Sequence, residues 1–508
     1  MKNIRNYIFI LLLFCISFYY GYWDILQKRP QSIHSWRQTD CASIALNYYQ
    51  HGMCFFKPEV LFQISDGGTS GYTVGECPLL YYFVAILWKI FGYSDFIYRF
   101  VNAIIFFIGL FALYKLVCKI TTDHFWSMVI PLLLFTSPVI AYYTPNYLTD
   151  TTSLALVFIG WNVLYSYFNE HKKNAFYFAI FIFTIAGLIK ISSLISVVAL
   201  ILLMIFNTLK QKKENSQQST QFSFDKIIPF SLMFATIFAW YLFAVFYNKK
   251  HNAVASDGSP YFSTQAFPIW NLSKTDIYEI LGEIKSNWIF EYQNAVVLLL
   301  FIFSIIICFY VLLKHKSFLL QLSAIITIGV FVFCSLWFYA FSQHDYYIIN
   351  LLILPLFSIV AFVEYAIHNK NKWVQSNFTK SLVAVLIIFS VYYSKEKLQD
   401  RYNGPKNEYH SYKDFHTITP YLRKIGIKPT DKVISLPHYA PCYTLYLMNQ
   451  PGWAATNFEY EILQIRKYIR LGARYLIING EDIAKKSCFT MYTKNQIGQY
   501  GSVSIYKL

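Results

Sequence analysis

Several features common in soluble proteins are scarce or missing from this sequence. Charged residues make up only 14% of the 508 residues, against a typical share of ~25%. The nine cysteines include no C-x-x-C pair, which argues against a zinc ribbon or a thioredoxin-like motif. The first apolar run follows "MKNIRNY" and lacks a small-residue cleavage site. We therefore expect a retained membrane anchor rather than a removed secretory signal.

Hydrophobic residues are abundant instead. They account for 56% of the chain, aromatic residues for 20%, and long apolar runs recur from "IFILLLFCISFYYGYW" to "SLVAVLIIFSVYY". This composition predicts a polytopic α-helical membrane protein. The formal charge of +16 would also suit a nucleic-acid-binding protein. However, the lysines lie in short clusters between apolar runs, where they indicate topology and contacts with anionic membrane lipids. No nucleic-acid partner is predicted.

The basic clusters predict an alternating topology with both long loops on the outer side. Lys2 and Arg5 keep the N-terminus in the cytoplasm. A count of about eleven spans also places the later basic clusters on the cytoplasmic side. The external loops are then 24–96 and 248–293, and the C-terminus is outside. The predicted spans are residues 7–23, 97–117, 125–144, 148–168, 175–189, 191–209, 228–247, 294–313, 318–340, 346–366 and 379–395.

One apolar stretch inside the first loop is ambiguous. Residues 78–92, "PLLYYFVAILWKIFG", are shorter than the ~20 residues that a span needs. Counting them as a span would also place Lys115 and Lys119 outside. We therefore predict an interfacial or re-entrant helix with Trp88 and Lys89 at headgroup depth, and a short true span is the alternative.

The composition changes after the last span. Residues 1–395 form the predicted membrane core, and 396–508 read as a small extracytoplasmic α/β domain. "DKVISLP", "ARYLIING" and "GSVSIYKL" resemble strands, with a helix over "NFEYEILQIRKYIRLG". The domain contains neither G-x-G-x-x-G nor G-x-x-x-x-G-K-[ST], so no nucleotide site is predicted there. Its Cys442 and Cys488 are either a disulfide or two separate thiols.

Polar residues recur at the outer ends of the apolar runs. Such residues are costly at this depth, so their repetition on one side predicts a shared site. For any single carboxylate a structural role is the alternative: Asp40, for example, would cap a helix beginning near Thr39. The candidates are Arg37, Asp40, Asp66, Glu76, Asp150, Lys190, His344, Asp345 and Tyr346.

The combination of these stretches resembles a known superfamily. "WRQTDCASIALNYYQHG", "GECPLLYYFVAILWKIFGYSDFIYRFVNAI", "PNYLTD", "GLIKISS" and "HDYYIINLLILPL" are similar to the bacterial GT-C membrane glycosyltransferases, which are related to the protein O-mannosyltransferases and to the lipid A aminoarabinose transferase. The resemblance covers roughly residues 1–395. It implies a GT-C-like core and transfer of a sugar from a polyprenyl-phosphate carrier to a lipid, glycan or protein acceptor at the outer face of the bacterial cytoplasmic membrane.

The resemblance also implies roles for individual residues. Asp40 matches the acidic catalytic residue of the first external loop, although Arg37 precedes it here, whereas relatives often have an Arg downstream of an Asp-Glu pair. Glu76 matches a metal-binding Glu before Pro, but Cys77 stands where a Lys often follows. Asp150 matches the acidic residue of the second external loop. Lys190, His344 and Tyr346 match substrate-binding positions near the carrier phosphate.

Chemical requirements point to the same residues. Transfer to a hydroxyl needs a base, and a partly buried carboxylate with a raised pKa is suited to that role, which we assign to Asp40 with Asp150 as second candidate. The leaving phosphate gains negative charge, which Arg37 and Lys190 would stabilise. A divalent ion held by Glu76 and Asp150 is a possible cofactor serving the same purpose.

Two other functional classes are open on sequence grounds. A secondary transporter would place ionisable groups near the membrane midplane within two similar halves, whereas these charges gather at one face and no repeat is visible. A non-catalytic scaffold for envelope assembly would tolerate loss of Asp40 and Asp150. The sequence identifies neither the sugar nor the acceptor.

Overall fold

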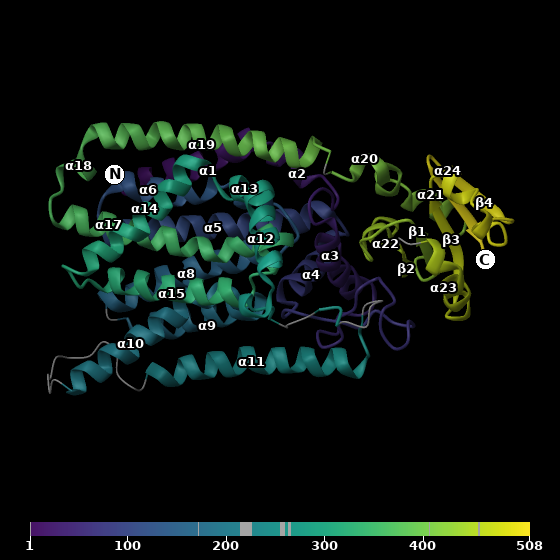
Figure 1. Cartoon of the computed structure of the whole chain (residues 1–508), viewed down its shortest axis with the longest axis horizontal. Coiled ribbons are helices and arrows are strands. Elements are labelled where there is room, and N and C mark those ends of the chain that lie inside the picture. Colours follow the sequence, from purple (N-terminus) through teal and green to yellow (C-terminus); the bar gives the residue numbers. More distant parts are fainter. Residues whose placement is uncertain are drawn as a thin grey trace.

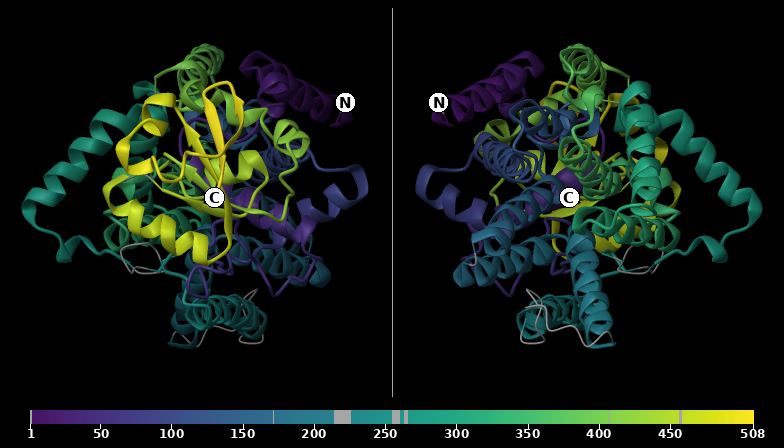
Figure 2. Two further views of the ribbon diagram at one scale, coloured as in Figure 1. Left: turned by 90° about the vertical axis from the view of Figure 1, so that its right-hand side faces the viewer. Right: turned by 90° about the vertical axis from the view of Figure 1, so that its left-hand side faces the viewer.

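A bundle of long helices and a small sheet domain make up the computed structural model (Figure 1). Viewed along the bundle, the sheet domain lies over the middle of one end (Figure 2). We call this end, where α3 and α4 also lie, the domain end. The structure describes residues 2–170, 172–213, 226–254, 260–262, 266–405, 407–455 and 458–508.

Apolar helices form the bundle. By length and composition, seven helices of the described chain are able to cross a membrane. They are α5 (Asp95–Thr121), η1 with α10 (Ile191–Leu194, Ile195–Lys213), α11 (Ile227–Lys250), α14 (Ala295–Leu312), α15 (Phe318–Leu336), η5 with α17 (Asp345–Leu352, Ile353–His368) and α19 (Asn377–Asn403). They are accompanied by α1 (Lys2–Tyr20), α6 (His124–Phe135), α8 (Asp150–Glu170) and α9 (Lys173–Ile189). The predicted polytopic helical class is confirmed.

One predicted span is interrupted. Residues 125–144 form two helices, α6 and α7 (Pro138–Tyr143), instead of one. Ser137 has extended backbone between them, and Pro138 occupies the first turn of α7. Because proline has no N–H to donate to the preceding turn, it begins a new helix more easily than it continues an old one. The break brings Tyr143 to the domain end, near the candidate site.

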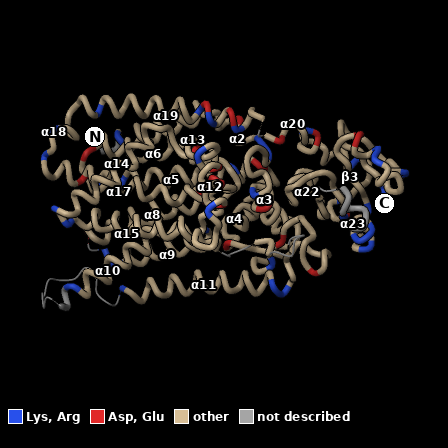
Figure 3. The backbone as a smooth tube through the Cα atoms, in the orientation of Figure 1, with Lys and Arg blue, Asp and Glu red and all other residues tan. Residues whose placement is uncertain are grey.

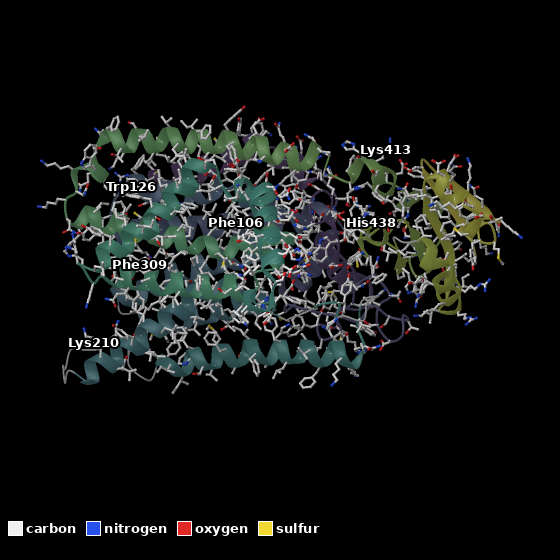
Figure 4. The ribbon with its side chains drawn as sticks, viewed as in Figure 1. Phe106, Trp126, Lys210, Phe309, Lys413 and His438 are labelled. Carbon is white, nitrogen blue, oxygen red and sulfur yellow. The ribbon has the colours of Figure 1, made fainter. Side chains whose placement is uncertain are left out.

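Ion pairs and hydrogen bonds fix the direction of the helices. Asp95, the first residue of α5, accepts a hydrogen bond from Tyr446 of the sheet domain at 2.6 Å. Asp123, just after the end of α5, pairs with Lys380 in the first turn of α19 at 2.8 Å. The end of α19 continues into the sheet domain. The start of α5 and the end of α19 therefore share the domain end, while Lys210 lies at the opposite end (Figure 4).

Helix α4 (Leu79–Phe91) does not cross the bundle. Its 13 residues span ~20 Å, less than the ~30 Å of a bilayer core. One face, with Tyr81, Val84 and Trp88, is buried, while Phe83 and Phe91 are exposed. Just before the helix, Cys77 N–H donates to Leu188 at the end of α9, and near its other end Trp88 donates to Ser94, next to α5. Both ends thus lie at the domain end, as expected for an interfacial helix.

The remaining helices are short and connect these elements. They are α2 (Tyr22–Leu26), α3 (Ser35–Gln50), η3 (Ile269–Asn271), α12 (Lys274–Glu283), the π-helix η4 (Ile284–Trp288), α13 (Ile289–Tyr292), α16 (Ala340–Gln343), α18 (Lys372–Gln375), α20 (Tyr409–Tyr412), η6 (Lys413–His416), α21 (Thr419–Lys424), α22 (Tyr443–Met448), α23 (Phe458–Arg470), α24 (Glu481–Ala484) and η7 (Ser487–Phe489). Several of them surround the domain end, so polar loops from distant parts of the chain meet there.

The C-terminal region folds as a five-stranded mixed sheet. The strand order is β2-β1-β3-β5-β4; β1 is parallel to β2 and β3, and β5 is antiparallel to β3 and β4. The predicted strands are β1, β3 and β5, and the predicted helix is α23. The strands are β1 (Lys432–Leu436), β2 (Gly452–Ala454), β3 (Ala473–Asn479), β4 (Gln496–Tyr500) and β5 (Val503–Lys507).

The sheet domain and the first loop share one core. Leu61 O accepts from Gly452 N–H at 3.1 Å and Gln63 N–H donates to Gly452 O at 2.8 Å, so the loop adds a short parallel bridge beside β2. Buried side chains of α3, α4 and α22 form one hydrophobic cluster. Such continuous burial holds the domain firmly against the loop rather than on a free linker.

Cys442 and Cys488 are separate thiols, so a disulfide between them is excluded. Cys442 is buried in the core shared with α3, whereas Cys488 packs in a second cluster with β1 and β3. The two side chains therefore belong to different hydrophobic cores.

Candidate functional site

Acidic and basic residues lie where the bundle meets the sheet domain (Figure 3). Helix α3 supplies the first two of them. Arg37 and Asp40 are three residues apart, so they lie on one face of the helix, and both are buried. Helix α3 is polar, with Gln38, Thr39 and Ser43 also buried, so it is packed inside protein and not against lipid. These features make α3 the centre of the candidate site.

Asp40 is 1% exposed and is held by a residue of the second long loop. Tyr261 O–H donates to Asp40 Oδ1 at 2.8 Å. Burial raises the pKa of Asp40 to about 6, although nearby Arg37 and the Tyr261 hydrogen bond oppose the shift. The capping interpretation is wrong, because α3 begins at Ser35 and Asp40 lies in its second turn. Asp40 is therefore a buried carboxylate poised to exchange a proton near neutral pH.

Arg37 and Glu76 form an ion pair beside Asp40. The guanidinium of Arg37 contacts Glu76 Oε1 and also lies 5.3 Å from the ring centre of Phe262. Tyr81 O–H donates to the same carboxylate oxygen. Burial alone would raise the pKa of Glu76, but the Arg37 charge outweighs it and the pKa is lowered. Glu76 is thus ionised at neutral pH and holds the Arg37 guanidinium in place.

Lys190 and Asp150 form a second ion pair. Lys190 lies between α9 and η1 in extended backbone, and Asp150 is the first residue of α8. Their Nζ and Oδ1 atoms are 3.2 Å apart. The ammonium also lies 5.6 Å from the ring centre of Tyr346 and 5.5 Å from that of Tyr347. Aromatic faces attract a cation, so Lys190 is fixed on three sides.

The two ion pairs belong to one electrostatic cluster. Glu76 interacts electrostatically with Lys190 as well as with Arg37, and Asp150 interacts with Arg37 as well as with Lys190. Arg37 also interacts with Tyr346. The structure therefore brings together most of the residues that the sequence singled out. The members of this cluster are Arg37, Asp40, Glu76, Asp150, Lys190 and Tyr346, and we call it the acid–base cluster.

His344 lies at the edge of the acid–base cluster. Its ring stacks on Tyr346 at 5.3 Å and lies 5.7 Å from Trp36. Burial lowers the pKa of His344 to about 3, so the imidazole is neutral at physiological pH. A neutral ring offers a hydrogen bond to a substrate but adds no positive charge for a phosphate. Asp66, another candidate, is exposed and pairs with His251 at 3.0 Å instead.

Beneath the cluster lies a second buried network. Asp345 accepts from Tyr143 O–H and from Arg401 Nη2, each at 2.7 Å, and His34 Nε2 lies 3.2 Å away. Arg401 also donates through Nε to Glu291 at 2.9 Å. The network joins α3, α7, α13, α19 and η5. It anchors the start of η5, which carries Tyr346 and Tyr347 to Lys190.

The predicted metal ligands are already paired with cations. Glu76 is held by Arg37 and Asp150 by Lys190. Among the described residues, no group of three or more His, Cys, Asp or Glu side chains is arranged to hold a metal ion. A carboxylate neutralised by an ammonium or guanidinium has little charge left for a divalent ion. The divalent cofactor therefore stays a prediction, and we assign no chemical step to it.

Several site residues escaped the sequence analysis. Tyr261 lies in a loop 221 positions from Asp40, and Arg401 lies beyond the predicted end of the last span. Cys442, from the sheet domain, lies 3.9 Å from Tyr261 O–H. The sequence analysis pointed only to the segment that carries Tyr261, because it predicts residues 248–293 to be the second external loop.

Comparisons with known proteins agree with this architecture. Residues 75–231 match the family model of dolichyl-phosphate-mannose-protein mannosyltransferases. A search of curated proteins gives no match. Among solved structures, ArnT from Cupriavidus metallidurans in the apo state has a TM-score of 0.60 at 10% identity, with 98% of this chain and 97% of that chain covered.

Two further structures show the same likeness. ArnT from Cupriavidus metallidurans bound to undecaprenyl phosphate gives a TM-score of 0.61 at 9% identity, covering 98% of this chain and 97% of that chain. An oligosaccharyltransferase of Archaeoglobus fulgidus, tethered to an acceptor peptide, gives 0.51 at 11% identity, covering 93% of this chain and 69% of that chain. The predicted resemblance is confirmed, and the chain has the fold of these ArnT structures.

Proposed function

We propose that the protein is an integral-membrane glycosyltransferase that moves a hexose or pentose from a polyprenyl-phosphate carrier to an acceptor hydroxyl. One observation carries the proposal: a buried carboxylate with a raised pKa, Asp40, shares a cluster with two cations, Arg37 and Lys190. A base and paired cations are the groups that this transfer needs. The fold supports the proposal, because a relative with this fold binds undecaprenyl phosphate.

Asp40 is the proposed general base. The acceptor hydroxyl gives its proton to the Asp40 carboxylate as its oxygen bonds to the anomeric carbon of the sugar. A pKa of about 6 leaves Asp40 ionised at neutral pH yet basic enough to take that proton. In the structure, the Tyr261 hydroxyl occupies the position of a donor to Asp40. The acceptor hydroxyl replaces it or binds the second carboxylate oxygen.

Arg37 and Lys190 are the proposed phosphate ligands. As the bond between the anomeric carbon and the phosphate oxygen breaks, the electron pair stays on the carrier phosphate, which gains one negative charge. Preorganised cations in a dry site stabilise that charge strongly. The guanidinium offers two parallel hydrogen bonds, whereas Lys190 acts as a point charge. Glu76 and Asp150 hold these cations in place before the donor arrives.

The alternatives, a transporter and a non-catalytic scaffold, explain less of the geometry. The ionisable cluster lies at one end of the bundle and contacts loops, not helices broken at mid-depth as a transport path requires. A scaffold has no need to bury Asp40 beside Arg37, because an unneeded buried charge is costly. Mass spectrometry of envelope lipids, glycans and proteins tests the proposal. A glycan present with the wild-type gene and missing with Asp40→Asn supports a transferase, whereas identical envelopes contradict it.

The ion expected from the sequence has its own test. With Glu76 and Asp150 paired to Arg37 and Lys190, we expect treatment with EDTA to leave kcat/KM within about twofold of the untreated value, since the described residues contain no preformed site for it to empty. Activity of purified enzyme before and after chelation checks this. Loss of activity that Mg²⁺ or Mn²⁺ restores would instead show that an ion displaces the two cations during turnover.

We also propose that the domain end faces the outside of the bacterial cytoplasmic membrane. Lys210, at the opposite end (Figure 4), and Lys316, in the turn between α14 and α15, then lie in the cytoplasm as the positive-inside rule requires. The acceptor and the carrier headgroup would meet on the outer side.

Cysteine labelling checks this orientation. In a Cys54→Ser background, which removes an exposed native thiol, Lys413→Cys should react with an impermeant maleimide in intact cells. Lys316→Cys should react only after the membrane is opened. The reverse pattern would invert the topology. Both positions are exposed, whereas Gln450 in the same domain is buried and would report poorly.

A further inference from the structure

The sheet domain contributes a side chain to the candidate site. Cys442 precedes α22, is fully buried, and lies 3.9 Å from the Tyr261 hydroxyl that donates to Asp40. Its thiol also interacts electrostatically with the Asp40 carboxylate. Three stretches distant in sequence, from the first loop, the second loop and the sheet domain, therefore meet at one carboxylate.

Bundle residues clamp the helix that follows Cys442. At the far end of α22, Arg29 donates to the carbonyl oxygen of Leu447 at 2.8 Å and to that of Tyr446 at 3.3 Å. The Tyr446 hydroxyl donates to Asp95 at 2.6 Å, and Arg29 pairs with Asp95 at 3.2 Å. The position of α22 is thus set by residues of the membrane core. Because α22 has only six residues and Cys442 directly precedes it, this clamp also sets where the Cys442 thiol lies relative to Asp40.

Among the described residues, the charged or titratable groups with the largest influence on Asp40 come from four segments. From α3 these are Arg37 and Cys41, from the turn before α4 it is Glu76, and from the two other stretches they are Tyr261 and Cys442. Arg37 is the only cation among them, and its charge is shared with Glu76. A small change in the hydrogen bonding of Asp40 should therefore alter the pKa of Asp40, because the charge of Arg37 is shared with Glu76 and does not mask the change. A thiol donates a weaker hydrogen bond than a hydroxyl, so it stabilises a carboxylate only slightly.

We propose that the sheet domain is an integral part of the catalytic site, in which Cys442 is a positioning residue that keeps Asp40 dry and sets its basicity. This inference rests on the proposed function of Asp40 as the general base. Cys442 touches no substrate in this scheme and acts through Asp40 and Tyr261. A weak donor at this position leaves the carboxylate more basic than a hydroxyl would.

Two substitutions of Cys442 should move the basicity of Asp40 in opposite directions. Cys442→Ser puts a stronger donor at the same place, so the acidic limb of the kcat/KM profile should shift down by about 0.5 pH units. Cys442→Ala removes the donor and deletes only one heavy atom, so the limb should shift up by about 0.5 pH units. A purely structural role predicts no opposite shifts.

Infrared titration measures the same quantity without substrate. The Asp40 carboxyl band is identified by its loss in Asp40→Asn, and its midpoint should follow the order Ser, Cys, Ala at position 442. Cys488→Ser and Cys488→Ala are matched controls in the same domain and should leave the midpoint unchanged, because Cys488 lies in another hydrophobic cluster. If the Ala variant fails to fold, the nearly isosteric Ser variant still decides the matter.

The outcomes separate the two proposals. Full turnover by Asp40→Asn would contradict the general-base role and leave the infrared titration as the sole test of Cys442. An inactive Asp40→Asn enzyme whose carboxyl midpoint is unmoved by Cys442→Ser would overturn the inference about the sheet domain alone. Shifts of both Cys442 variants in one direction would overturn it as well.

Discussion

Asp40→Asn should lower kcat by about 10²–10⁴-fold, which is the range that a general base contributes, while the protein remains folded and inserted in the membrane. The amide keeps the shape and the acceptor oxygen that Tyr261 requires, but it cannot take a proton from the acceptor. Single-turnover kinetics with a polyprenyl-phosphate-sugar donor measure the effect. The KM for the donor should change little, because Arg37 and Lys190 are untouched.

Asp66→Asn is a matched control for this substitution. It makes the same chemical change in the same loop, but Asp66 is exposed and pairs with His251 away from the acid–base cluster. We expect turnover within about twofold of wild type, as is usual for surface positions. If both variants lost activity equally, the effect would reflect the loop and not the base. If Asp40→Asn kept full turnover, Asp150 would become the candidate base.

The same carboxylate predicts a pH dependence of activity and of stability. Because Asp40 must be ionised to act, kcat/KM should fall about tenfold per pH unit below its pKa of about 6. For stability the sign is opposite. A carboxyl whose pKa is raised on folding contributes stability that is present below its ordinary pKa and lost as the pH rises through the folded pKa. Asp40→Asn should therefore melt at a higher temperature than wild type at pH 8, but not at pH 4.

The strands that the sequence revealed are those with buried apolar runs. β1, β3 and β5 each bury most of their side chains, so their composition marks them clearly. β2 has three residues, and β4 is the partly exposed "QIGQY" at the sheet edge, so neither has a hydrophobic pattern of its own. Both strands form because the backbone of a neighbouring strand pairs with them, β1 with β2 and β5 with β4. Such pairing depends on the tertiary fold and cannot be inferred from the local sequence.

The candidate site shows the same division. Polar residues next to apolar runs are conspicuous, because placing a charge near the membrane is energetically unfavourable. Arg37, Asp40 and Lys190 could be identified on this ground alone. Their partners could not. Whether Arg37 pairs with Asp40 or Glu76 depends on how the loop of Glu76 folds back over α3, and the contact of Tyr261 joins segments 221 positions apart. Sequence spacing constrains a helix face but not a contact between loops.

Arg401 is the most informative of the residues that the sequence did not indicate. The last predicted span ends at residue 395, where the composition changes to that of a soluble domain, within the charged segment "SKEKLQDRYN". Helix α19 continues to Asn403, and Arg401 within that segment is buried. Arg401 donates hydrogen bonds there through Nη2 to Asp345 and through Nε to Glu291. Partners on two other elements, α13 and η5, thus explain a charge that a hydrophobicity profile assigns to a solvent-exposed segment.

Removal of Arg401 should be among the most destabilising substitutions in the chain. Arg401→Met keeps much of the side-chain volume but leaves the fully buried Asp345 carboxylate without its cation, and breaking one partner of a buried pair costs about 3–5 kcal/mol. Thermal unfolding in detergent should show a large fall in melting temperature. Asp345 would retain only Tyr143 and His34, so the start of η5 should also loosen and donor KM should rise through Lys190.

Lys397→Met is the control that isolates burial as the cause. Lys397 pairs with the same Glu291 at 2.8 Å from the same helix, but its side chain is 29% exposed. Water can solvate the partner once Lys397 is gone, so the cost should stay below about 1 kcal/mol. The double variant Arg401→Met/Asp345→Asn should recover part of the stability lost in Arg401→Met, because it removes the stranded charge. Equal melting temperatures for Arg401→Met and Lys397→Met would mean that the network is solvated and does not hold η5 beneath Lys190.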